Sequence, residues 1–388
     1  MQELRKNEMY RPLYPPLRLQ HVDSYAARRG QIYVIFVLFV TILATALLIR
    51  QFGTLPVSSN KRTITARKNM QKCEQYYGKV SIFVAESAAL NTNNLTRDSL
   101  DCYVKGANYS LIRVNIDNDP RVNEVCSKHK TALFKRHCAA SVYLQDTDWM
   151  LFVDTQAGVV NPEHCIEEWI DDRVDMIFFE RFFNWEIAAG SYLVKNTALT
   201  RNFLRQVAKW EFKEMPIWNN QDQGAFMLQL QRTLSPAAKW ELRACHKYWQ
   251  TATSYQTYTA MITCVRSALG ARKLWTRKAR IYRKAHAWIR DASISRNSWS
   301  NNDFMLQGWK DDLSNKDCPF ESSFKIKECG ATLKGWNWRR QKKIELESLK
   351  EILQGAEEYY RKEFPSEGRV IPNLDLPIVA SCFPHCEK

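Results

Sequence analysis

The sequence predicts an α/β fold, because short apolar strands alternate with segments of helical periodicity. Four runs have the length and composition of buried strands: Lys79–Ala85, Leu111–Ile116, Met150–Val153 and Val174–Phe179. The stretches expected to be helical are 132–144, 165–171 and 198–212, and residues 86–106 form either a helix or a decorated loop. This alternation predicts a central sheet covered by helices.

An apolar segment near the amino end has the length of a membrane span. From Ile32 to Ile49 nearly every residue is apolar or small, and a bilayer core needs roughly 17–25 such residues. A cleaved signal peptide is the alternative, because Ala44-Thr45-Ala46 has a small-x-small pattern. The long polar stretch before the span and the apolar residues after Ala46 favour an uncleaved signal anchor.

The cysteines and glycosylation sequons indicate which side of the membrane holds the bulk of the chain. All eleven cysteines follow the span, as do the two N-x-Ser/Thr sequons at Asn94 and Asn108. Disulfides and N-glycans belong to an oxidising lumen. We therefore expect a single-pass type II protein of the Golgi or ER membrane, glycosylated at both sequons, with its carboxyl-terminal domain in the lumen.

The expected organisation along the chain follows from these features. The expected segments are a cytoplasmic tail (1–31), the anchor (32–49), a stem (50–75), a lumenal domain (76–335) and a carboxyl-terminal helix with a cysteine-bearing tail (336–388). Apolar residues from Leu346 to Tyr359 line one face of that helix. An odd cysteine count leaves at least one thiol unpaired or bonded to another chain. A Cys382–Cys386 disulfide is expected rather than a metal corner.

The chain is strongly basic, and the charge is uneven. Its 388 residues are 45% hydrophobic, enough for a substantial core, and its net charge of +15 indicates acidic partners. In the lumen these are nucleotide diphosphates, anionic glycans or headgroups, and nucleic acid is not expected. Between Arg266 and Arg290 there are nine Lys or Arg and no Asp or Glu. This run forms either a solvated basic face or a groove for a phosphate or an acidic acceptor.

The segment around Asp154 carries the strongest functional signal. The apolar run Met150–Val153 delivers Asp154 to the carboxyl end of a strand, and that edge of an α/β sheet is where ligands bind. A plain structural role is the alternative, with Asp154 capping the turn that follows. Two residues later stands Gln156, so the pattern is Asp-x-Gln.

Several motifs together resemble a known family. They are 154–162, 182–197, 220–225, 288–291 and 303–310. Over residues 78–330 they resemble a family of nematode membrane proteins of unassigned function. That family is similar to the galactosyl- and mannosyltransferases of the fungal Golgi and plant xyloglucan pathways. The resemblance implies a GT-A-like, Rossmann-like nucleotide-diphospho-sugar transferase domain.

The resemblance also implies roles for individual residues. Asp154 matches the first Asp of the Asp-x-Asp metal motif, Gln156 falls at its second Asp, and Gln307 falls where the pattern has a metal-binding His. Gly190 and Ser191 match a turn that lines the donor pocket. Lys310 would face the diphosphate, and Asp222 matches an Asp near the transferred sugar.

The two Gln residues at positions 156 and 307 predict a degenerate metal site. Mn²⁺ or Mg²⁺ prefers charged oxygen ligands, and two neutral Gln side chains weaken its binding. Side-chain cations offer another way to stabilise the leaving diphosphate, and Lys310, Arg290 and the basic run from Arg266 are the candidates.

Two further carboxylates each have two interpretations. Glu186, in an aromatic segment, is either an acid–base catalyst or an ordinary salt-bridged residue. Asp222 either acts at the sugar or caps the segment 223–230. The sequence thus predicts a hexosyltransferase that moves a sugar from a UDP- or GDP-sugar to a glycan. The alternative is a catalytically inactive relative that binds glycans or serves as a scaffold.

Overall fold

The computed structural model describes residues 73–386, except for 214, 217, 219–220, 310–311, 331 and 364–381. The chain divides into two compact units, 1–65 and 66–388, and the first lies wholly outside the described residues. The predicted tail, anchor (32–49) and most of the stem therefore lie outside them too. Within the described residues, no helix combines the length and apolar character needed to cross a bilayer.

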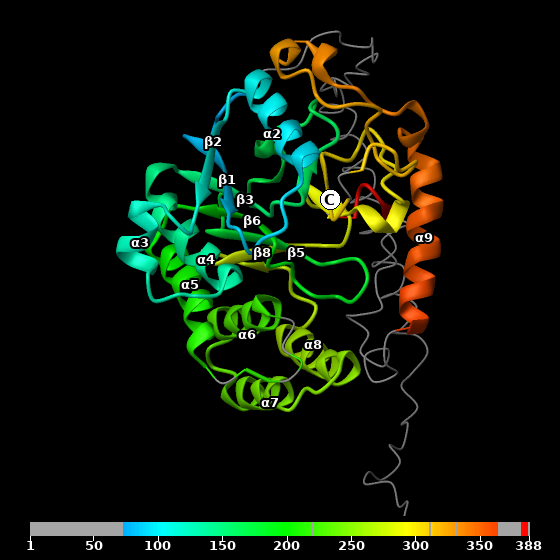
Figure 1. Ribbon diagram of the computed structural model, residues 1–388. Helices are drawn as coiled ribbons and strands as arrows, with labels where there is room; N and C mark the ends of the chain where they lie inside the picture. The colour runs from blue at the N-terminus through cyan, green and yellow to red at the C-terminus, as the bar shows by residue number, and fades with distance from the viewer. Residues whose placement is uncertain are drawn as a thin grey trace, which may run out of the picture. The chain divides into compact units, whose positions relative to one another are not determined.

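A seven-stranded mixed sheet forms the centre of the second unit (Figure 1). Its order is β2 (Ser110–Asn115), β1 (Val80–Glu86), β3 (Trp149–Val153), β6 (Ser191–Lys195), β5 (Met176–Phe179), β8 (Ala279–Tyr282) and β7 (Leu274–Trp275). Strand β6 runs antiparallel to both of its neighbours, and β7 runs antiparallel to β8, while the remaining pairs are parallel. This mixed α/β architecture confirms the predicted α/β class.

A small second sheet lies next to the carboxyl end of β3. It contains β4 (Ala157–Val159), β10 (Met305–Gln307) and β9 (Ile289–Asp291), with β10 antiparallel to β4 and parallel to β9. Strand β4 follows β3 after only three residues. This sheet therefore brings residues near 290 and 306 to the end of β3.

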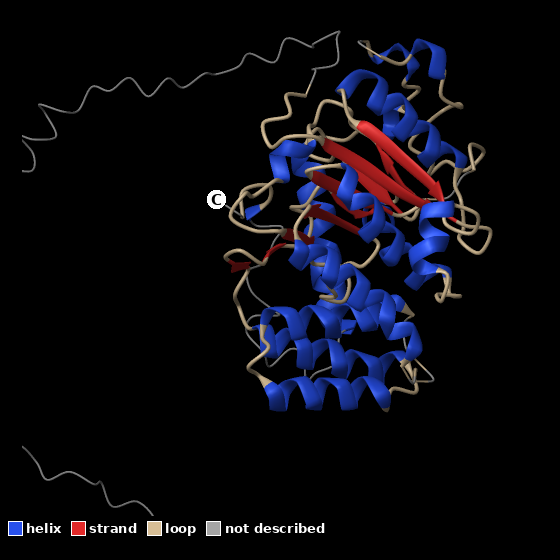
Figure 2. Cartoon of the chain, turned by 90° about the vertical axis from the view of Figure 1, so that its left-hand side faces the viewer, coloured by secondary structure: helices blue, strands red, loops and turns tan. Residues whose placement is uncertain are grey.

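Helices cover the central sheet on both faces (Figure 2). The helices are α2 (Asn94–Ala107), α3 (Pro120–Cys126), α4 (Ala132–Tyr143), α5 (Ala198–Ala208), α6 (Asp222–Leu234), α7 (Lys239–Gln250), α8 (Tyr255–Leu269) and α9 (Leu346–Glu363). Short 3-10 turns are η1 (Leu144–Asp146), η2 (Ile166–Trp169), η3 (Lys209–Phe212), η4 (Ala292–Ser295), η5 (Ile326–Glu328), η6 (Leu333–Gly335) and η7 (Arg340–Lys342).

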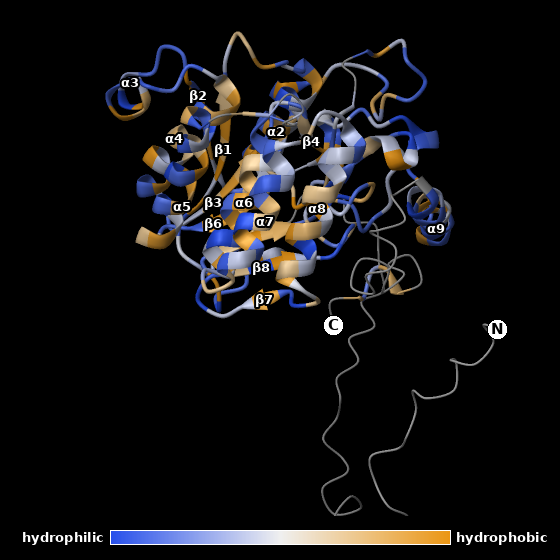
Figure 3. Cartoon of the chain, turned by 90° about the horizontal axis from the view of Figure 1, so that it is seen from below, coloured by the Kyte–Doolittle hydropathy of each residue, from blue (hydrophilic) through white to orange (hydrophobic). Residues whose placement is uncertain are grey.

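Alternation along the strands builds two cores. In β3, Met150 and Phe152 pack into the core formed with α4, α5, α6 and α8, whereas Leu151 and Val153 face the core formed with α2 and the second sheet. Successive side chains of a strand point to opposite faces, so each central strand contributes to both cores. Hydrophobic residues accordingly concentrate on the central strands, and the outer surfaces of α5 and α9 are mostly hydrophilic (Figure 3).

Local signals explain where several helices begin. Asn93 caps α2, Asp119 caps α3 and Thr197 caps α5, each by accepting a backbone N–H with its side-chain oxygen. Ser254 and Thr257 form a capping box at α8. These caps satisfy N–H groups that the first turn of a helix otherwise leaves without partners.

Five disulfides cross-link the described part of the chain. They are Cys73–Cys165, Cys102–Cys329, Cys126–Cys138, Cys245–Cys264 and Cys382–Cys386. The expected disulfide of the tail is thus confirmed. Cys318 is buried and takes part in none of the five, which accounts for the odd count.

The predicted strands and helices mostly match the structure, with specific differences. The helix expected at 165–171 is wrong, because only the short turn η2 forms there. The helix expected at 198–212 ends at Ala208 and continues as the tighter turn η3. Residues 86–106 contain all of α2 except its last residue, Ala107, and the carboxyl-terminal helix is α9.

Candidate functional site

Asp154 lies at the carboxyl end of β3 and forms an ion pair with Arg136 of α4. The Arg136 Nη1 to Asp154 Oδ2 distance is 2.7 Å. The other carboxylate oxygen accepts the backbone N–H of Gln156 at 3.1 Å, so the turn-capping role is present as well. The Asp154 side chain remains 29% exposed. It is therefore held in place by protein contacts and still reaches solvent.

Asp222 is the first residue of α6 and lies on the opposite side of the same guanidinium. Its Oδ2 accepts hydrogen bonds from Arg136 Nε at 3.1 Å and Nη2 at 2.6 Å, and contacts His137 Nε2 at 3.0 Å. Asp222 is buried. The cap of α6 is Gln221, so the prediction that Asp222 caps this helix is wrong. Arg136, His137, Asp154 and Asp222 are called the Arg136 cluster below.

The charges of the Arg136 cluster are set by burial and by one another. Burial disfavours the Arg136 cation, but the carboxylates of Asp222 and Asp154 outweigh it and raise the Arg136 pKa. Burial likewise disfavours the ionised form of Asp222, yet Arg136 and His137 outweigh burial and lower its pKa. Burial lowers the pKa of His137, so this imidazole is neutral at pH 7. One guanidinium thus forms ion pairs with two carboxylates from different elements.

The predicted metal residues meet at one edge but do not fit a divalent cation. Gln307 pairs with Ala157 across the small sheet, and Gly308 N donates to Gln156 O at 3.0 Å. Gln307 Nε2, however, donates to Asp291 Oδ1 at 2.9 Å. The Arg136 guanidinium already pairs with the Asp154 carboxylate. A metal ion would therefore have to compete with this cation for the carboxylate. Among the described residues, no group of three or more His, Cys, Asp or Glu has a metal-binding arrangement.

The predicted donor-binding residues lie in different settings. A Cβ atom built on Gly190 would lie 3.7 Å from Asp154 Oδ2, so this glycine borders the cluster. Ser191 is buried, donating its hydroxyl to Phe152 O at 2.7 Å and accepting the indole N–H of Trp288 at 2.9 Å. Its side chain therefore serves the sheet rather than a ligand surface. Lys310 lies outside the described residues.

Arg290 has partners that give it a structural task. It is buried, and its guanidinium donates to both carboxylate oxygens of Asp303, at 2.6 and 3.1 Å. It also donates to the Ser295 hydroxyl and to the Ser298 carbonyl, each at 2.7 Å. These contacts hold the loop that leads from β9 to β10. Its role as a donor ligand stays a prediction.

Most of the basic residues from Arg266 to Arg290 pair with carboxylates within the fold, while Arg272 and Arg277 are exposed. Five of the nine basic residues form salt bridges with carboxylates from elsewhere in the fold: Arg266 and Lys273 with Glu180, Arg280 with Asp171, Lys284 with Glu357, and Arg290 with Asp303. The expectation of a solvated face or an open phosphate groove is therefore wrong for these residues. Acidic residues distant in sequence pair with these five.

Glu186 is buried, and its Oε1 accepts the phenol O–H of Tyr258 at 2.6 Å. The residues just before Glu186 and Asp222 both adopt positive φ angles, 58° at Trp185 and 53° at Gln221. Non-glycine residues rarely occupy this region, and such strain concentrates at functional sites. Both candidate catalytic carboxylates thus follow a strained residue.

A cavity of about 450 Å³ lies next to the Arg136 cluster. Ser87, which follows β1, and Asp117, which follows β2, form one wall, where the Ser87 hydroxyl donates to the Asp117 carboxylate at 2.9 Å. Lys130 and Lys135 line another wall. Lys135 directly precedes Arg136 on α4, so one helix turn joins the cavity to the cluster.

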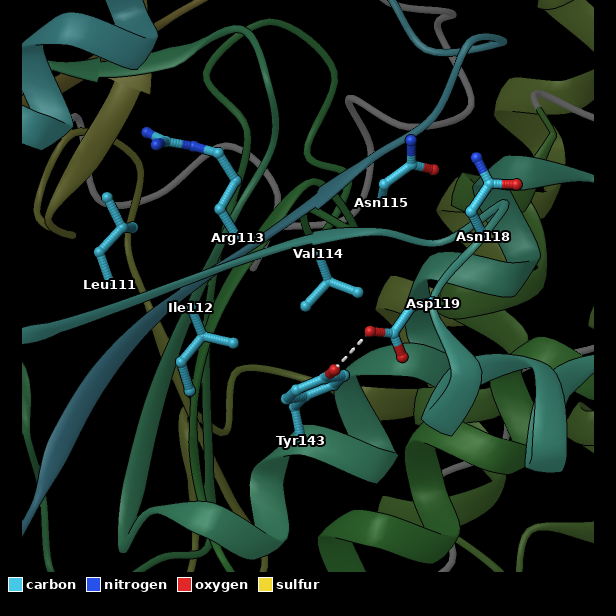
Figure 4. Close-up of a pocket in the computed structure, with 8 residues that line it drawn as sticks. All are labelled: Leu111, Ile112, Arg113, Val114, Asn115, Asn118, Asp119 and Tyr143. Atoms are coloured by element: carbon cyan, nitrogen blue, oxygen red, sulfur yellow. Dashed lines mark hydrogen bonds between the residues drawn. The ribbon is translucent and has the colours of Figure 1, made fainter.

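A second cavity, about 530 Å³ in volume, lies elsewhere along the edge strand β2 (Figure 4). Its lining includes Ile112, Val114 and Tyr143, whose phenol donates to Asp119 Oδ2 at 2.7 Å. No residue of the Arg136 cluster lines either cavity. The smaller cavity is the better candidate, because its lining includes Lys135, the neighbour of Arg136 in α4, and residues that follow β1 and β2.

Arg136 and His137 are the site residues that sequence reasoning did not assign. The signal was present as Lys135-Arg136-His137, three basic residues in an otherwise largely apolar helix. All three side chains are buried or nearly so. Buried basic residues of a helix need polar partners; Asp154 and Asp222 provide them for Arg136 and His137, and the Asn123 amide oxygen does so for Lys135.

Comparisons with known proteins add a family assignment. No curated protein matches the chain. Similar solved structures include a glycosyltransferase involved in glycosylation of the PBCV-1 major capsid, at 11% identity and a TM-score of 0.35, covering 60% of this chain and 96% of that one. Another is A197 from STIV, at 10% identity and a TM-score of 0.23, covering 38% and 75%. Residues 100–322, more than half of the 388 residues, match the family described as "Protein of unknown function, DUF273", and the chain therefore belongs to that family.

Proposed function

We propose that this protein is a glycosyltransferase-like protein that binds a nucleotide-diphosphate sugar without a divalent cation and transfers its hexose to a glycan. The observation that carries the proposal is the Arg136 guanidinium, which contacts Asp154 at 2.7 Å and Asp222 at 2.6 Å. It puts a permanent positive charge beside Asp154, at the strand end where the resemblance implies a metal. The similarity to characterised Golgi transferases stays a prediction.

The cavity next to the cluster is the proposed place for the nucleotide. It lies at the carboxyl ends of β1 and β2, where α/β sheets bind their ligands, and 450 Å³ is within the range of small-molecule sites. Lys130 and Lys135 line it. Cationic side chains there would offset the charge of a diphosphate and of the leaving group.

The cluster itself would position the sugar. Arg136 holds the Asp154 carboxylate, which stays partly exposed and faces the space beside Gly190. In that place Asp154 would accept hydrogen bonds from sugar hydroxyls. Gly190 has no side chain, so a ligand can approach the backbone closely at this position.

The catalytically inactive, glycan-binding or scaffolding alternative also has a specific observation in its favour. Asp222 is buried, and its Oδ2 already contacts three nitrogen atoms of Arg136 and His137. A carboxylate so occupied is not presented to a sugar. Hydrolysis or transfer from a radiolabelled nucleotide sugar separates the two functions, because only a transferase releases the sugar.

Calorimetric titration of the full-length protein with UDP and GDP, with Mn²⁺ and with EDTA, tests the proposal. One nucleotide should bind with the same affinity in both conditions. Lys135→Ala should weaken that binding about ten-fold or more, the loss expected for one charge-assisted hydrogen bond. Lys239→Ala, which removes an exposed lysine of α7, is the matched control. Binding that requires Mn²⁺, or no binding of either nucleotide, would contradict the proposal.

We also propose a Golgi or ER membrane location, with the carboxyl-terminal domain in the lumen. Five disulfides suit an oxidising compartment. Asn94 and Asn108 are both exposed and accessible to glycan attachment. Treating the protein from secretory-competent cells with an N-glycosidase should shift its mobility, and Asn94→Gln with Asn108→Gln should abolish that shift. An unshifted wild-type protein would contradict lumenal placement.

A further inference from the structure

A group of polar and aromatic side chains extends from the small sheet, and none of them lines the nucleotide cavity. It consists of Gln307, Asp291, Arg181, Tyr360 and Tyr255, here called the polar–aromatic strip. We propose that this strip binds the acceptor, as a neutral carbohydrate. The inference rests on the proposed function, since it assigns the second substrate of that same site.

The inner end of the strip is joined to the Arg136 cluster by the small sheet. Gln307 of β10 lies opposite Ala157, which follows Gln156 and is three residues from Asp154. From there, hydrogen bonds continue outward. Gln307 Nε2 and Arg181 Nη2 both donate to Asp291 Oδ1, at 2.9 and 2.6 Å.

The outer end of the strip is aromatic and half-exposed. Tyr255, the first residue of α8, is 43% exposed. Burial is the main cause that raises its pKa, and Asn184, Glu186, Arg181 and Tyr360 all act on its phenol. The ring of Tyr360 lies 6.1 Å from that of Phe183, and the Arg181 guanidinium lies 4.5 Å from the same Phe183 ring. Phe183 therefore places Tyr360 near Arg181.

The five residues of this strip come from five elements, namely β10, β9, the loop after β5, α9 and α8. Arg181 begins the loop after β5, which the Glu180–Ile187 bridge closes and which extends toward α9 (Figure 1). Helix α9 supplies Tyr360, whose ring is 6.1 Å from that of Phe183 in the loop. Leu349 and Leu353 of α9 are fully buried in a cluster with Phe182. The contact between α9 and the loop is therefore a packed one.

The chemistry of the strip suits a neutral sugar. Aromatic rings pack against the C–H faces of sugars, while amide, carboxylate and guanidinium groups offer the mixed donors and acceptors that hydroxyl groups need. Arg181 and Asp291 neutralise each other, so the strip does not attract an anionic ligand as Lys130 and Lys135 do. Arg181 Nε is buried and has no hydrogen-bond partner within the described residues.

An array of neutral and acidic oligosaccharides, probed with the full-length protein, tests the inference. Wild-type protein should bind a subset of the neutral oligosaccharides. Tyr255→Ala should weaken that binding about ten-fold, the factor that one aromatic contact contributes, and Tyr255→Phe should retain most of it. UDP or GDP binding should be unchanged in both variants, because Tyr255 does not line the nucleotide cavity.

Tyr248→Ala is the matched control, since Tyr248 is a tyrosine of α7 that is 51% exposed and lies outside the strip. It should bind carbohydrate like the wild type. A protein that binds nucleotide but no neutral oligosaccharide would overturn this inference and leave the proposed function standing. Equal losses in Tyr255→Ala and Tyr248→Ala, or binding of acidic glycans alone, would also overturn it. If the wild-type protein bound neither UDP nor GDP, that result would instead refute the proposed function itself.

Discussion

Replacing Arg136 with alanine should destabilise the protein more than any change at an exposed salt bridge. The guanidinium is 5% exposed, and the Asp222 side chain that it contacts is 6% exposed. Removing the cation leaves a buried carboxylate whose remaining contact in the cluster is His137 Nε2 at 3.0 Å. Breaking a buried ion pair by removing one partner costs about 3–5 kcal/mol. The contact to Asp154 adds little, because that carboxylate is 29% exposed.

Urea unfolding at pH 7, followed by tryptophan fluorescence with the disulfides intact, measures this change. Arg121→Ala is the matched control, because Arg121 and Asp146 form a 2.6 Å pair whose side chains are 46% and 39% exposed. That control should lose under about 1 kcal/mol. The double variant Arg136→Met, Asp222→Asn should recover most of the loss, because both charges leave together.

The pH dependence provides a second check on the same cluster. The folded-state pKa of Asp222 is lowered, despite burial, by Arg136 and His137. A carboxylate with a depressed pKa stabilises the fold above its unfolded-state pKa, and this stabilisation disappears as the pH falls through its folded-state pKa. The difference between wild type and Arg136→Ala should therefore shrink in acid. A loss below about 1 kcal/mol for Arg136→Ala at pH 7, or simple additivity in the double variant, would refute the buried-pair argument.

Two further predictions concern stability. A Cβ atom at Gly158 would lie 2.5 Å from the Trp309 ring and 3.0 Å from the Thr96 backbone, so Gly158→Ala should lower the urea midpoint by an equivalent of about 1–3 kcal/mol. Gly355 lies in α9 with open space around it, so Gly355→Ala should be neutral or stabilising. If Gly158→Ala and Gly355→Ala changed the urea midpoint equally, the steric argument would be contradicted. The Asp171 pKa is lowered to about 2, chiefly by Arg173. The free energy of unfolding of the wild type should thus exceed that of Asp171→Asn by about 1–2 kcal/mol at pH 6, and this difference should shrink as the pH falls from about 4 to 2. A difference that does not change with pH would contradict this prediction.

Local patterns in the sequence were sufficient for the strands at the centre of the sheet. The run Met150–Val153 is apolar throughout and buried on both faces, so its composition alone indicates a central strand. The same reasoning placed Asp154 at the carboxyl edge. The cysteines of the tail, four residues apart, were close enough in sequence for their disulfide to be expected.

Short strands were harder to find because their stability comes from partners distant in sequence. β7, β9 and β10 contain two or three residues each, too few for a periodic pattern to stand out. The tight turn η2 likewise replaced an expected helix, since Cys165 just before it is bonded to Cys73. Propensity is a weak prior where such constraints act.

The sequence by itself determined the α/β class and the position of Asp154 at the end of a strand, two residues before Gln156. Only the tertiary structure decided that Arg136 of α4 pairs with both Asp154 and Asp222. Arg136 is 18 residues from one partner and 86 from the other, and nothing local indicates which carboxylates it meets. The same holds for the basic run near Arg266, which reads as a charged surface until Glu180 and Asp171 are seen beside it. Ion pairing depends on distance in space and on burial, and both are properties of the folded chain.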